Sequence, residues 1–187
     1  AVGDATNAVS LVRTSTGDVA ITGGSGADTI LAERVTTRQG VSVWTGGAND
    51  GVTIRGDQGG RSTIGGSLTI DTGAGNDAVS LTLTNIAQSL AVVLGEGADS
   101  FASDRVNISF NATIDAGSGA DTLTMRDTVI RYFLYAFLGD GDDTVSIATS
   151  DALAASLFGG LGTQDRLTVD AATRAAVDTF FSKEFEL

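Results

Sequence analysis

The chain has 187 residues, of which 42% are hydrophobic, enough apolar material for the core of one domain. Its formal net charge is −12, and it contains no His and no Cys. This charge disfavours nucleic acid and anionic membrane surfaces as partners, because both require clustered cations. The missing Cys and His exclude disulfides, thiolate chemistry and the usual zinc ligands. A metal cation held by oxygen ligands fits this composition, and calcium is the simplest such partner.

A Gly-rich turn that ends in Asp recurs along the chain. There are 25 Gly and no Pro, so the turns depend on Gly, which adopts positive φ at little cost. A degenerate first copy begins at Gly3, with Asn7 in the Asp position. A nearly constant repeat of this length predicts a solenoid. The turn aspartates follow one another at intervals of 22, 27, 22, 22, 22 and 22 residues: Asp28, Asp50, Asp77, Asp99, Asp121, Asp143 and Asp165.

Each repeat predicts a strand, the Gly turn, a second strand and a less regular third side. Before the turn, apolar residues alternate with polar ones, as at Leu68 and Ile70. After the turn, the residues two and four places beyond the Asp are mostly apolar, as at Val79 and Leu81. Alternation with a period of two is typical of a strand with one buried face. Apolar residues on the third side include Val106, Ile108, Val129 and Ile130.

Two segments depart from the repeat. The 27-residue interval contains a five-residue insertion between Gly56 and Gly66, which we expect to form a surface loop. Residues 170–187 lose the turn motif, and we interpret them as a C-terminal cap that protects the last strand edge. Their apolar residues have a helix-like spacing: Ala172, Ala176, Phe180 and Phe181. We therefore predict an all-β, right-handed parallel β-helix of about eight coils over residues 1–169, followed by this short cap.

The turn sequences resemble those of a known family. They read GGSGAD at 23–28, TGAGND at 72–77, LGEGAD at 94–99 and LGDGDD at 138–143. These turns resemble the GGxGxDxUx repeat of RTX (repeats-in-toxin) proteins over about 140 residues, from Gly23 to Val169. The resemblance implies a bacterial secreted or surface β-helix in which the seven turn aspartates and backbone carbonyls bind calcium. This chain has one such turn per coil, where RTX proteins have two, so only one edge would carry ions.

Electrostatics also favours a cation at the turns. Stacked coils would place the turn carboxylates about 5 Å apart, where each pair repels by roughly 1 kcal/mol even in water. Bound calcium would offset this repulsion. In the alternative, each Asp accepts hydrogen bonds from N–H groups of its own or the next turn and binds no ion. Further candidate calcium ligands are Asp140, Asp142, Asn76 and Glu96.

An aromatic run, RYFLYAFL, occupies residues 131–138. The strand register points Phe133, Tyr135 and Phe137 outward and the residues between them inward, and Trp44 shares the register of Phe137. Outward aromatic rings bind sugars or a partner protein. In the alternative, the insertion loop or the Phe-rich tail covers them.

We expect no enzymatic activity. Polysaccharide lyases with a β-helix resemble this chain only in architecture and need a base, whereas this chain lacks His and its Arg residues are scattered. No carboxylate pair is singled out for glycoside hydrolysis, and compact turns leave little material for the walls of a cleft. The composition and the resemblance together favour an extracellular or cell-surface module with a structural or adhesive role, whose folding calcium would promote. A carbohydrate-binding or lyase-like β-helix is the alternative.

Overall fold

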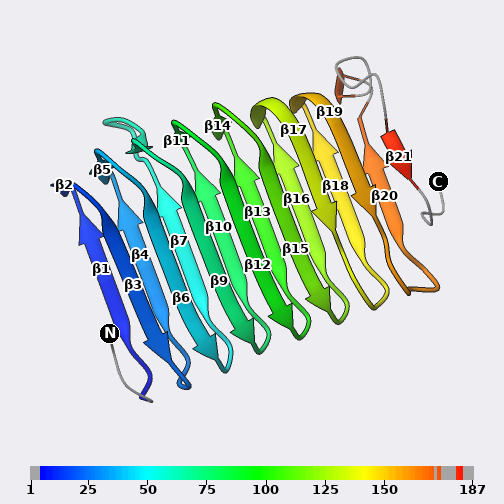
Figure 1. Cartoon of the computed structure of the whole chain (residues 1–187), viewed down its shortest axis with the longest axis horizontal. Helices are drawn as coiled ribbons and strands as arrows, with labels where there is room; N and C mark the ends of the chain where they lie inside the picture. Colours follow the sequence, from blue (N-terminus) through cyan, green and yellow to red (C-terminus); the bar gives the residue numbers. More distant parts are fainter. Residues whose placement is uncertain (1–4, 171, 174–179, 183–187) are drawn as a thin grey trace.

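The structure, a computed structural model, describes residues 5–170, 172–173 and 180–182. Strands of successive repeats stack in parallel, each coil upon the last, into an elongated solenoid (Figure 1). Register partners in the regular coils are 22 residues apart, as for Val79, Phe101 and Leu123. The predicted all-β parallel solenoid is therefore confirmed.

The first side of the solenoid, which follows the Gly turns, is an eight-stranded parallel sheet. Its strands, in spatial and chain order, are β1 (Ala8–Val12), β4 (Thr29–Glu33), β7 (Gly51–Arg55), β10 (Ala78–Thr82), β13 (Ser100–Asp104), β16 (Thr122–Arg126), β18 (Thr144–Ala148) and β20 (Arg166–Val169).

The other two sides form one 13-stranded parallel sheet, because the last coils join them through long continuous strands. The side before the Gly turns contains β3 (Val19–Gly24), β6 (Val41–Gly47), β9 (Leu68–Ala74), β12 (Leu90–Glu96) and β15 (Ala112–Ser118). The third side contains β2 (Ser15–Thr16), β5 (Thr36–Thr37), β8 (Ser62–Ile64), β11 (Thr84–Ile86) and β14 (Asn107–Ile108). The joining strands are β17 (Val129–Phe137) and β19 (Asp151–Phe158), and β21 (Phe180–Ser182) pairs with β19.

The core runs along the solenoid axis between the three sides. Inward positions repeat from coil to coil, so each apolar side chain stacks on its equivalents in the neighbouring coils. The column two places after each turn Asp is at most 2% exposed at Ile30, Val52, Val79, Phe101, Leu123 and Val145. This is the column that alternation in the sequence predicts to face inward.

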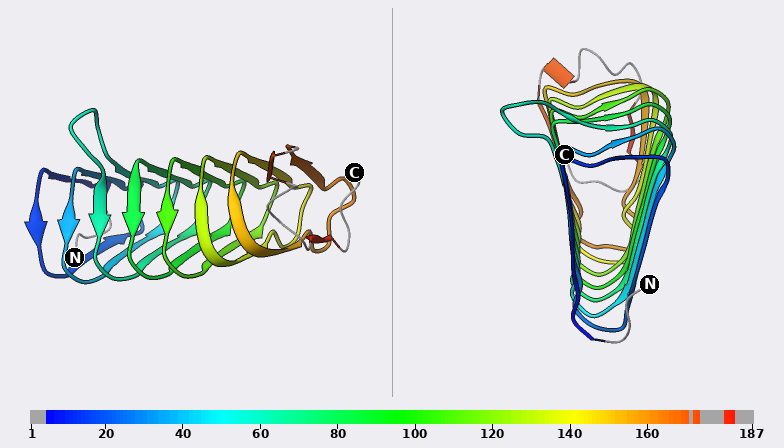
Figure 2. Two further views of the ribbon diagram at one scale, coloured as in Figure 1. Left: turned by 90° about the horizontal axis from the view of Figure 1, so that it is seen from above. Right: turned by 90° about the vertical axis from the view of Figure 1, so that its left-hand side faces the viewer.

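The cross-section of the solenoid is a wedge, as the view along its axis shows (Figure 2). The Gly turns, such as the one between β3 and β4, lie at the narrow end and line the lower edge in Figure 1. The strands before and after each turn therefore approach each other most closely there. Side chains that point inward at this edge have little room and little access to water.

The corner between the first and third sides requires a left-handed backbone. Residues six places after the turn Asp have φ between 46° and 53°: Arg34, Leu83, Arg105, Asp127 and Thr149. Buried hydroxyls follow this corner and donate to backbone carbonyls, as Ser62 does to Arg55 at 2.7 Å and Thr128 does to Arg126 at 3.0 Å. These buried polar side chains thus have hydrogen-bond partners.

The predicted insertion forms a loop between β7 and β8. Asp57 and Gly60 exchange backbone hydrogen bonds of 2.9 and 3.1 Å across its tip, and the loop projects from the body of the solenoid (Figure 2). Asp57 lies 3.4 Å from Arg34 and 3.8 Å from Arg13. The loop is thus tied to the corner of the N-terminal coils.

The C-terminal segment departs from its predicted helical spacing. Ala172 is helical, Ala176 lies outside the described residues, and Phe180 and Phe181 lie in strand β21. The correction has a physical reason, because β21 continues the sheet by pairing with β19 and so satisfies the edge of that strand. No helix among the described residues is long and apolar enough to cross a membrane.

Candidate functional site

All seven turn aspartates point into the narrow edge of the wedge. Each is between 0% and 4% exposed: Asp28, Asp50, Asp77, Asp99, Asp121, Asp143 and Asp165. They share the inward parity of the apolar residues two and four places later, so the alternation that buries those residues also buries the aspartates. The carboxylates therefore form an internal column beneath the turns and do not line their outer surface.

One oxygen of each carboxylate joins a continuous hydrogen-bond ladder. From Asp28 to Asp143, the N–H of each turn Asp donates to Oδ1 of the Asp one coil further along the chain, at distances from 2.6 to 3.0 Å. Asn7 starts this ladder, because its backbone N–H donates to Oδ1 of Asp28 at 2.9 Å. This geometry is close to the hydrogen-bonded alternative to calcium, with the donor in the preceding turn.

The second oxygen of the same carboxylates has no partner in six of the seven turns. Oδ2 is buried without a hydrogen bond in Asp50, Asp77, Asp99, Asp121, Asp143 and Asp165. In Asp28 it accepts the N–H of Gly24 at 3.1 Å. A buried carboxylate oxygen without a donor is costly, and the cost is larger when neighbouring carboxylates repel it. The column thus needs a proton or a cation to neutralise it.

Burial changes the acidity of this column. Burial raises the pKa of Asp121 to about 7 and that of Asp143 to about 6, and neighbouring carboxylates add to both rises. Burial also raises the pKa of Asp77 and of Asp99. Hydrogen bonds from the ladder N–H groups oppose these shifts in each case. The middle of the column therefore holds protons at a pH where an exposed carboxyl is ionised.

The glycines of the turn allow the coils to stack this closely. Gly117 has φ of 98°, and a Cβ at this position would overlap the carbonyl oxygen of Gly95 in the preceding coil. At Gly23 an added Cβ would overlap Oδ2 of Asp28. The glycines thus serve both the backbone shape and the space that the carboxylate occupies.

A second, outer set of hydrogen bonds is accepted by the side chain before the turn Asp in three of the turns, at Asn49, Asn76 and Asp142. The side-chain oxygen of Asn49 accepts the N–H of Asn76 at 2.8 Å, and that of Asn76 accepts the N–H of Ala98 at 2.9 Å. Asp142 accepts N–H groups from Thr163 and Gln164, and the first of these is the main cause of its lowered pKa. In these outer bonds the acceptor side chain belongs to the earlier coil and the N–H to the later one, which is opposite to the buried Asp ladder.

The other candidate ligands lie apart from the buried column. Asp140, Asp142, Asn76 and Glu96 are exposed, whereas the turn aspartates are buried. Among the residues that the structure describes, no group of three or more acidic, His or Cys side chains is arranged to hold a metal ion.

Calcium takes six to eight oxygen ligands, which is more than the aspartate column offers at any one turn. The unpaired Oδ2 atoms supply one free carboxylate oxygen per coil, and Oδ1 is already a hydrogen-bond acceptor. Backbone carbonyls would have to supply most of the remaining ligands. The Oδ2 row is the part of the column that suits a cation, and calcium binding by the seven aspartates stays a prediction.

Aromatic side chains form a patch over the outer face of β17 and β19. Phe137 stacks on Phe158 with ring centroids 5.0 Å apart and planes 4° from parallel, and the two are 41% and 39% exposed. Phe133 is 37% exposed and lies against the half-buried Tyr135 with centroids 6.0 Å apart. The intervening Leu134 and Ala136 are buried, as the register predicts. The role of Phe133, Tyr135 and Phe137 in binding a partner or a sugar stays a prediction.

The insertion loop does not cover these aromatics, because it contacts Arg13 and Arg34 in the N-terminal coils. Trp44 stands in the column of Phe137, separated from it by Asp71, Val93 and Asp115. Its ring is therefore separate from the patch, as its position in the sequence predicts.

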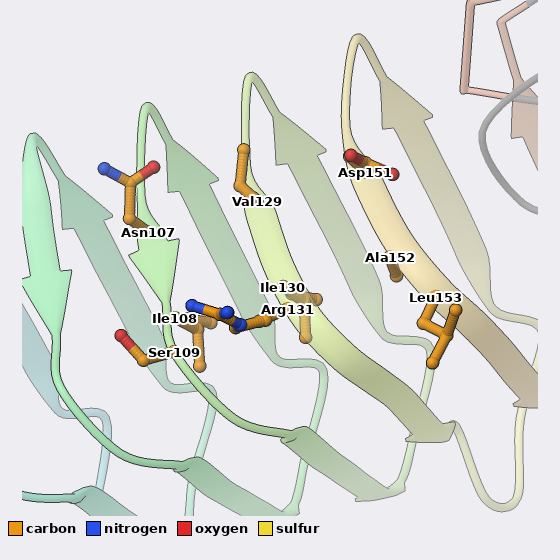
Figure 3. Close-up of a pocket in the computed structure, with 9 residues that line it drawn as sticks. All are labelled: Asn107, Ile108, Ser109, Val129, Ile130, Arg131, Asp151, Ala152 and Leu153. Carbon is orange, nitrogen blue, oxygen red and sulfur yellow. The ribbon is translucent and has the colours of Figure 1, made fainter.

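A groove on the third side was not predicted from the sequence. It has a volume of about 540 Å³ and crosses three coils, from β14 over β17 to β19 (Figure 3). Buried Ile108, Ile130 and Ala152 lie along its floor, and Val129 and Leu153 are 44% and 61% exposed. The polar side chains that line it are Asn107, Ser109, Arg131 and Asp151. In the sequence these residues show only an alternation of apolar and polar positions, and that pattern does not predict a groove.

Comparison with protein-family models, with curated proteins and with solved structures found no match to the chain.

Proposed function

We propose that the chain is a non-enzymatic, extracellular structural module of a bacterial secreted or surface protein. It acts as a rigid solenoid that spaces and presents the surfaces along its sides. The observation that carries the proposal is the buried ladder, in which every turn from Asn7 to Asp165 is hydrogen-bonded to the next through the same atoms. A ladder that engages every coil makes neighbouring coils depend on one another, as a rigid spacing element requires.

The unpaired Oδ2 row supports a dependence of this module on protons or on calcium. Both neutralise the carboxylates, and both would bind the folded column more tightly than the dispersed carboxylates of the unfolded chain. In the proposal, calcium outside the cell takes this role at neutral pH, and protons take it in mildly acidic surroundings. The resemblance of the turns to RTX repeats supports calcium, and the lack of an acidic cluster among the described residues limits the number of ions.

The test is thermal unfolding of metal-stripped protein, followed by circular dichroism, at pH 5 and at pH 7.5. We expect calcium to raise the melting temperature at pH 7.5 by several degrees, magnesium to raise it less, and both to have little effect at pH 5. A melting temperature that calcium leaves unchanged at pH 7.5 would remove calcium from the proposal.

A matched pair of variants tests the ladder itself. Asp77→Ala with Asp99→Ala removes two buried acceptors, whereas Glu96→Ala with Asp140→Ala removes the same charge from exposed sites. We expect the first variant to unfold at a much lower temperature and the second to keep the stability of the parent chain. Equal melting temperatures would contradict a structural role for the ladder.

The exposed aromatic patch supports adhesion as a second role. The Phe137 and Phe158 rings are stacked flat and remain about two-fifths exposed, which suits contact with a sugar face or a protein surface. A glycan array and a surface-protein pull-down with the parent chain and with Phe137→Ala provide the test. Loss of a bound partner by a Phe137→Ala variant that stays folded at the assay temperature would support the adhesive role, and a Phe137→Ala variant with unchanged partners would exclude this face.

A further inference from the structure

The groove across β14, β17 and β19 is lined by one positively and one negatively charged side chain, and neither has a partner within the part of the protein that the structure describes. Among the described residues, the side chains of Arg131 and Asp151 make no hydrogen bond and no ion pair. Several other exposed arginines are engaged, since Arg55 lies 2.6 Å from Glu33 and Arg105 lies 2.8 Å from Asp104. Arg38 and Arg166 also lack a side-chain partner in the described ranges, but of these three arginines Arg131 is the one that lines the groove.

The two charged side chains lie at different ends of the groove. Arg131 projects from β17 towards Ser109 and the β14 coil, and Asp151 stands on β19, away from the guanidinium (Figure 3). Their separation leaves the guanidinium fork open to a ligand. The fork presents N–H donors in the geometry that a carboxylate accepts.

We propose that this groove binds a segment of an acidic polysaccharide, with a sugar carboxylate on Arg131. The proposal concerns a site distinct from the buried ladder and from the aromatic patch, and it does not depend on the structural role. The remaining lining groups suit the other parts of a sugar chain. Asp151 accepts hydroxyl donors, and Asn107 has a free side-chain oxygen while its amide donates to Asn85 at 3.0 Å.

Apolar groups in and beside the groove suit the C–H faces of sugar rings. Val129 and Leu153 provide exposed aliphatic surface within it. Phe110 and Tyr132 each follow a lining residue in the chain, are 50% and 39% exposed, and pair with centroids 5.7 Å apart. Aromatic and aliphatic surface next to a few directed polar groups is the usual composition of a carbohydrate site.

The direction of the groove favours an extended polymer. Its lining comes from equivalent positions in successive coils, since Asn107, Val129 and Asp151 are register neighbours. A chain lying across these coils would run along the solenoid axis and meet a new set of side chains about every 4.8 Å. The net charge of −12 does not prevent such binding, because charges beyond about 8 Å are screened at physiological salt.

The experiment is isothermal titration calorimetry of the full chain with a galacturonic acid hexasaccharide. Its fully methyl-esterified form is the control for charge, and a hexaglutamate peptide is the control for ligand class. We expect the acidic sugar to bind with a Kd below about 1 mM, the ester to bind at least tenfold more weakly, and the peptide not to bind. Binding of the peptide as tight as that of the sugar would contradict a carbohydrate site, and no binding of the acidic sugar would overturn the proposal.

Substitutions at two positions locate the site. Arg131→Gln should weaken binding of the acidic hexasaccharide at least tenfold, and Arg131→Lys should weaken it less. Arg166→Gln, which makes the same charge change on β20 of the first sheet, should leave the Kd within a factor of two. Unchanged binding by Arg131→Gln, or equal losses in the Arg131→Gln and Arg166→Gln variants, would show that Arg131 does not hold the carboxylate. All three variants should melt at the temperature of the parent chain, because both residues are exposed.

Discussion

The main-chain N–H of Asp99 donates to Oδ1 of Asp121, one coil further along the chain, at 2.8 Å. Oδ2 of the same Asp121 carboxylate is buried and has no partner. One side chain thus joins two coils and also places an uncompensated oxygen in the interior. The stability of the solenoid therefore depends on what neutralises this column.

Removing a ladder acceptor should cost more than removing its charge. Oδ1 of Asp99 accepts the N–H of Asp77 at 2.7 Å, and Asp99→Ala leaves that buried donor unpaired. We expect Asp99→Ala to lower the free energy of unfolding by about 2–3 kcal/mol at pH 7.5. Asp99→Asn keeps a carbonyl acceptor and loses the charge, so it should lose less than half as much. Urea unfolding of the two variants provides the measurement, and equal losses would contradict the ladder.

Stability should fall as the pH rises from 5 to 8. Because burial raises the pKa of Asp121 to about 7 and that of Asp143 to about 6, the folded chain binds more protons than the unfolded chain in this range. Their stabilising contribution is full below the ordinary Asp pKa and is lost as the pH rises through the folded values. We expect a loss on the order of 3 kcal/mol across this range in metal-free protein.

The groups with lowered pKa act in a separate range of pH. Hydrogen bonds lower the pKa of Asp142 and of Asp170, so their contribution is lost only below the ordinary Asp value. Urea unfolding between pH 5 and pH 8 thus isolates the buried column. Asp121→Asn should flatten this dependence, and a chain that is most stable at pH 8 would show that the column is not protonated.

The turn glycines should tolerate substitution only where the coils leave space. Gly117 has positive φ, and a Cβ there would overlap the carbonyl oxygen of Gly95, so Gly117→Ala should cost more than about 2 kcal/mol. Gly51, which starts β7, has no atom within 4 Å of an added Cβ. Gly51→Ala should therefore change the free energy of unfolding by less than about 0.5 kcal/mol. Thermal unfolding of both variants decides the point, and similar melting temperatures would be inconsistent with the close stacking of the turns.

The Phe137 and Phe158 rings should be energetically coupled. Their centroids are 5.0 Å apart and their planes are nearly parallel. A double-mutant cycle with Phe137→Ala and Phe158→Ala should give a coupling energy of about 0.5–1.5 kcal/mol, measured by urea unfolding. Additive losses would mean that the two rings do not support each other in solution.

The sequence predicts the solenoid well because each of its signals is repeated. The spacing of the turn aspartates gives the coil length, and the alternation through Val79 and Leu81 gives the inward face. The same alternation places Asp77 inward, because it shares the parity of the buried Val79 and Leu81. The repulsion between stacked carboxylates led us to expect calcium at the turns, but it does not distinguish an ion from a proton or a hydrogen bond.

Features that depend on contacts between unlike segments were not predictable. The pairing of Phe180 with Ala155 makes β21 a strand, although the local spacing around Phe180 is helix-like. The groove beside Arg131 lies where β17 and β19 run without a break from the third side into the side before the Gly turns. The sequence predicts neither that these strands are continuous nor that the Arg131 side chain has no ion-pair partner among the described residues.

The most direct measurement is an NMR titration of the side-chain carboxyl carbons in metal-free protein, with each turn Asp assigned. The account predicts that Asp121 titrates near pH 7 and Asp143 near pH 6, while the exposed Asp142 titrates below the ordinary Asp value. Calcium should lower the apparent pKa of the buried column if it binds there. Titration of all the turn aspartates near pH 4 or below would mean that the column is solvated and ionised, and it would contradict a buried ladder that protons or calcium must neutralise.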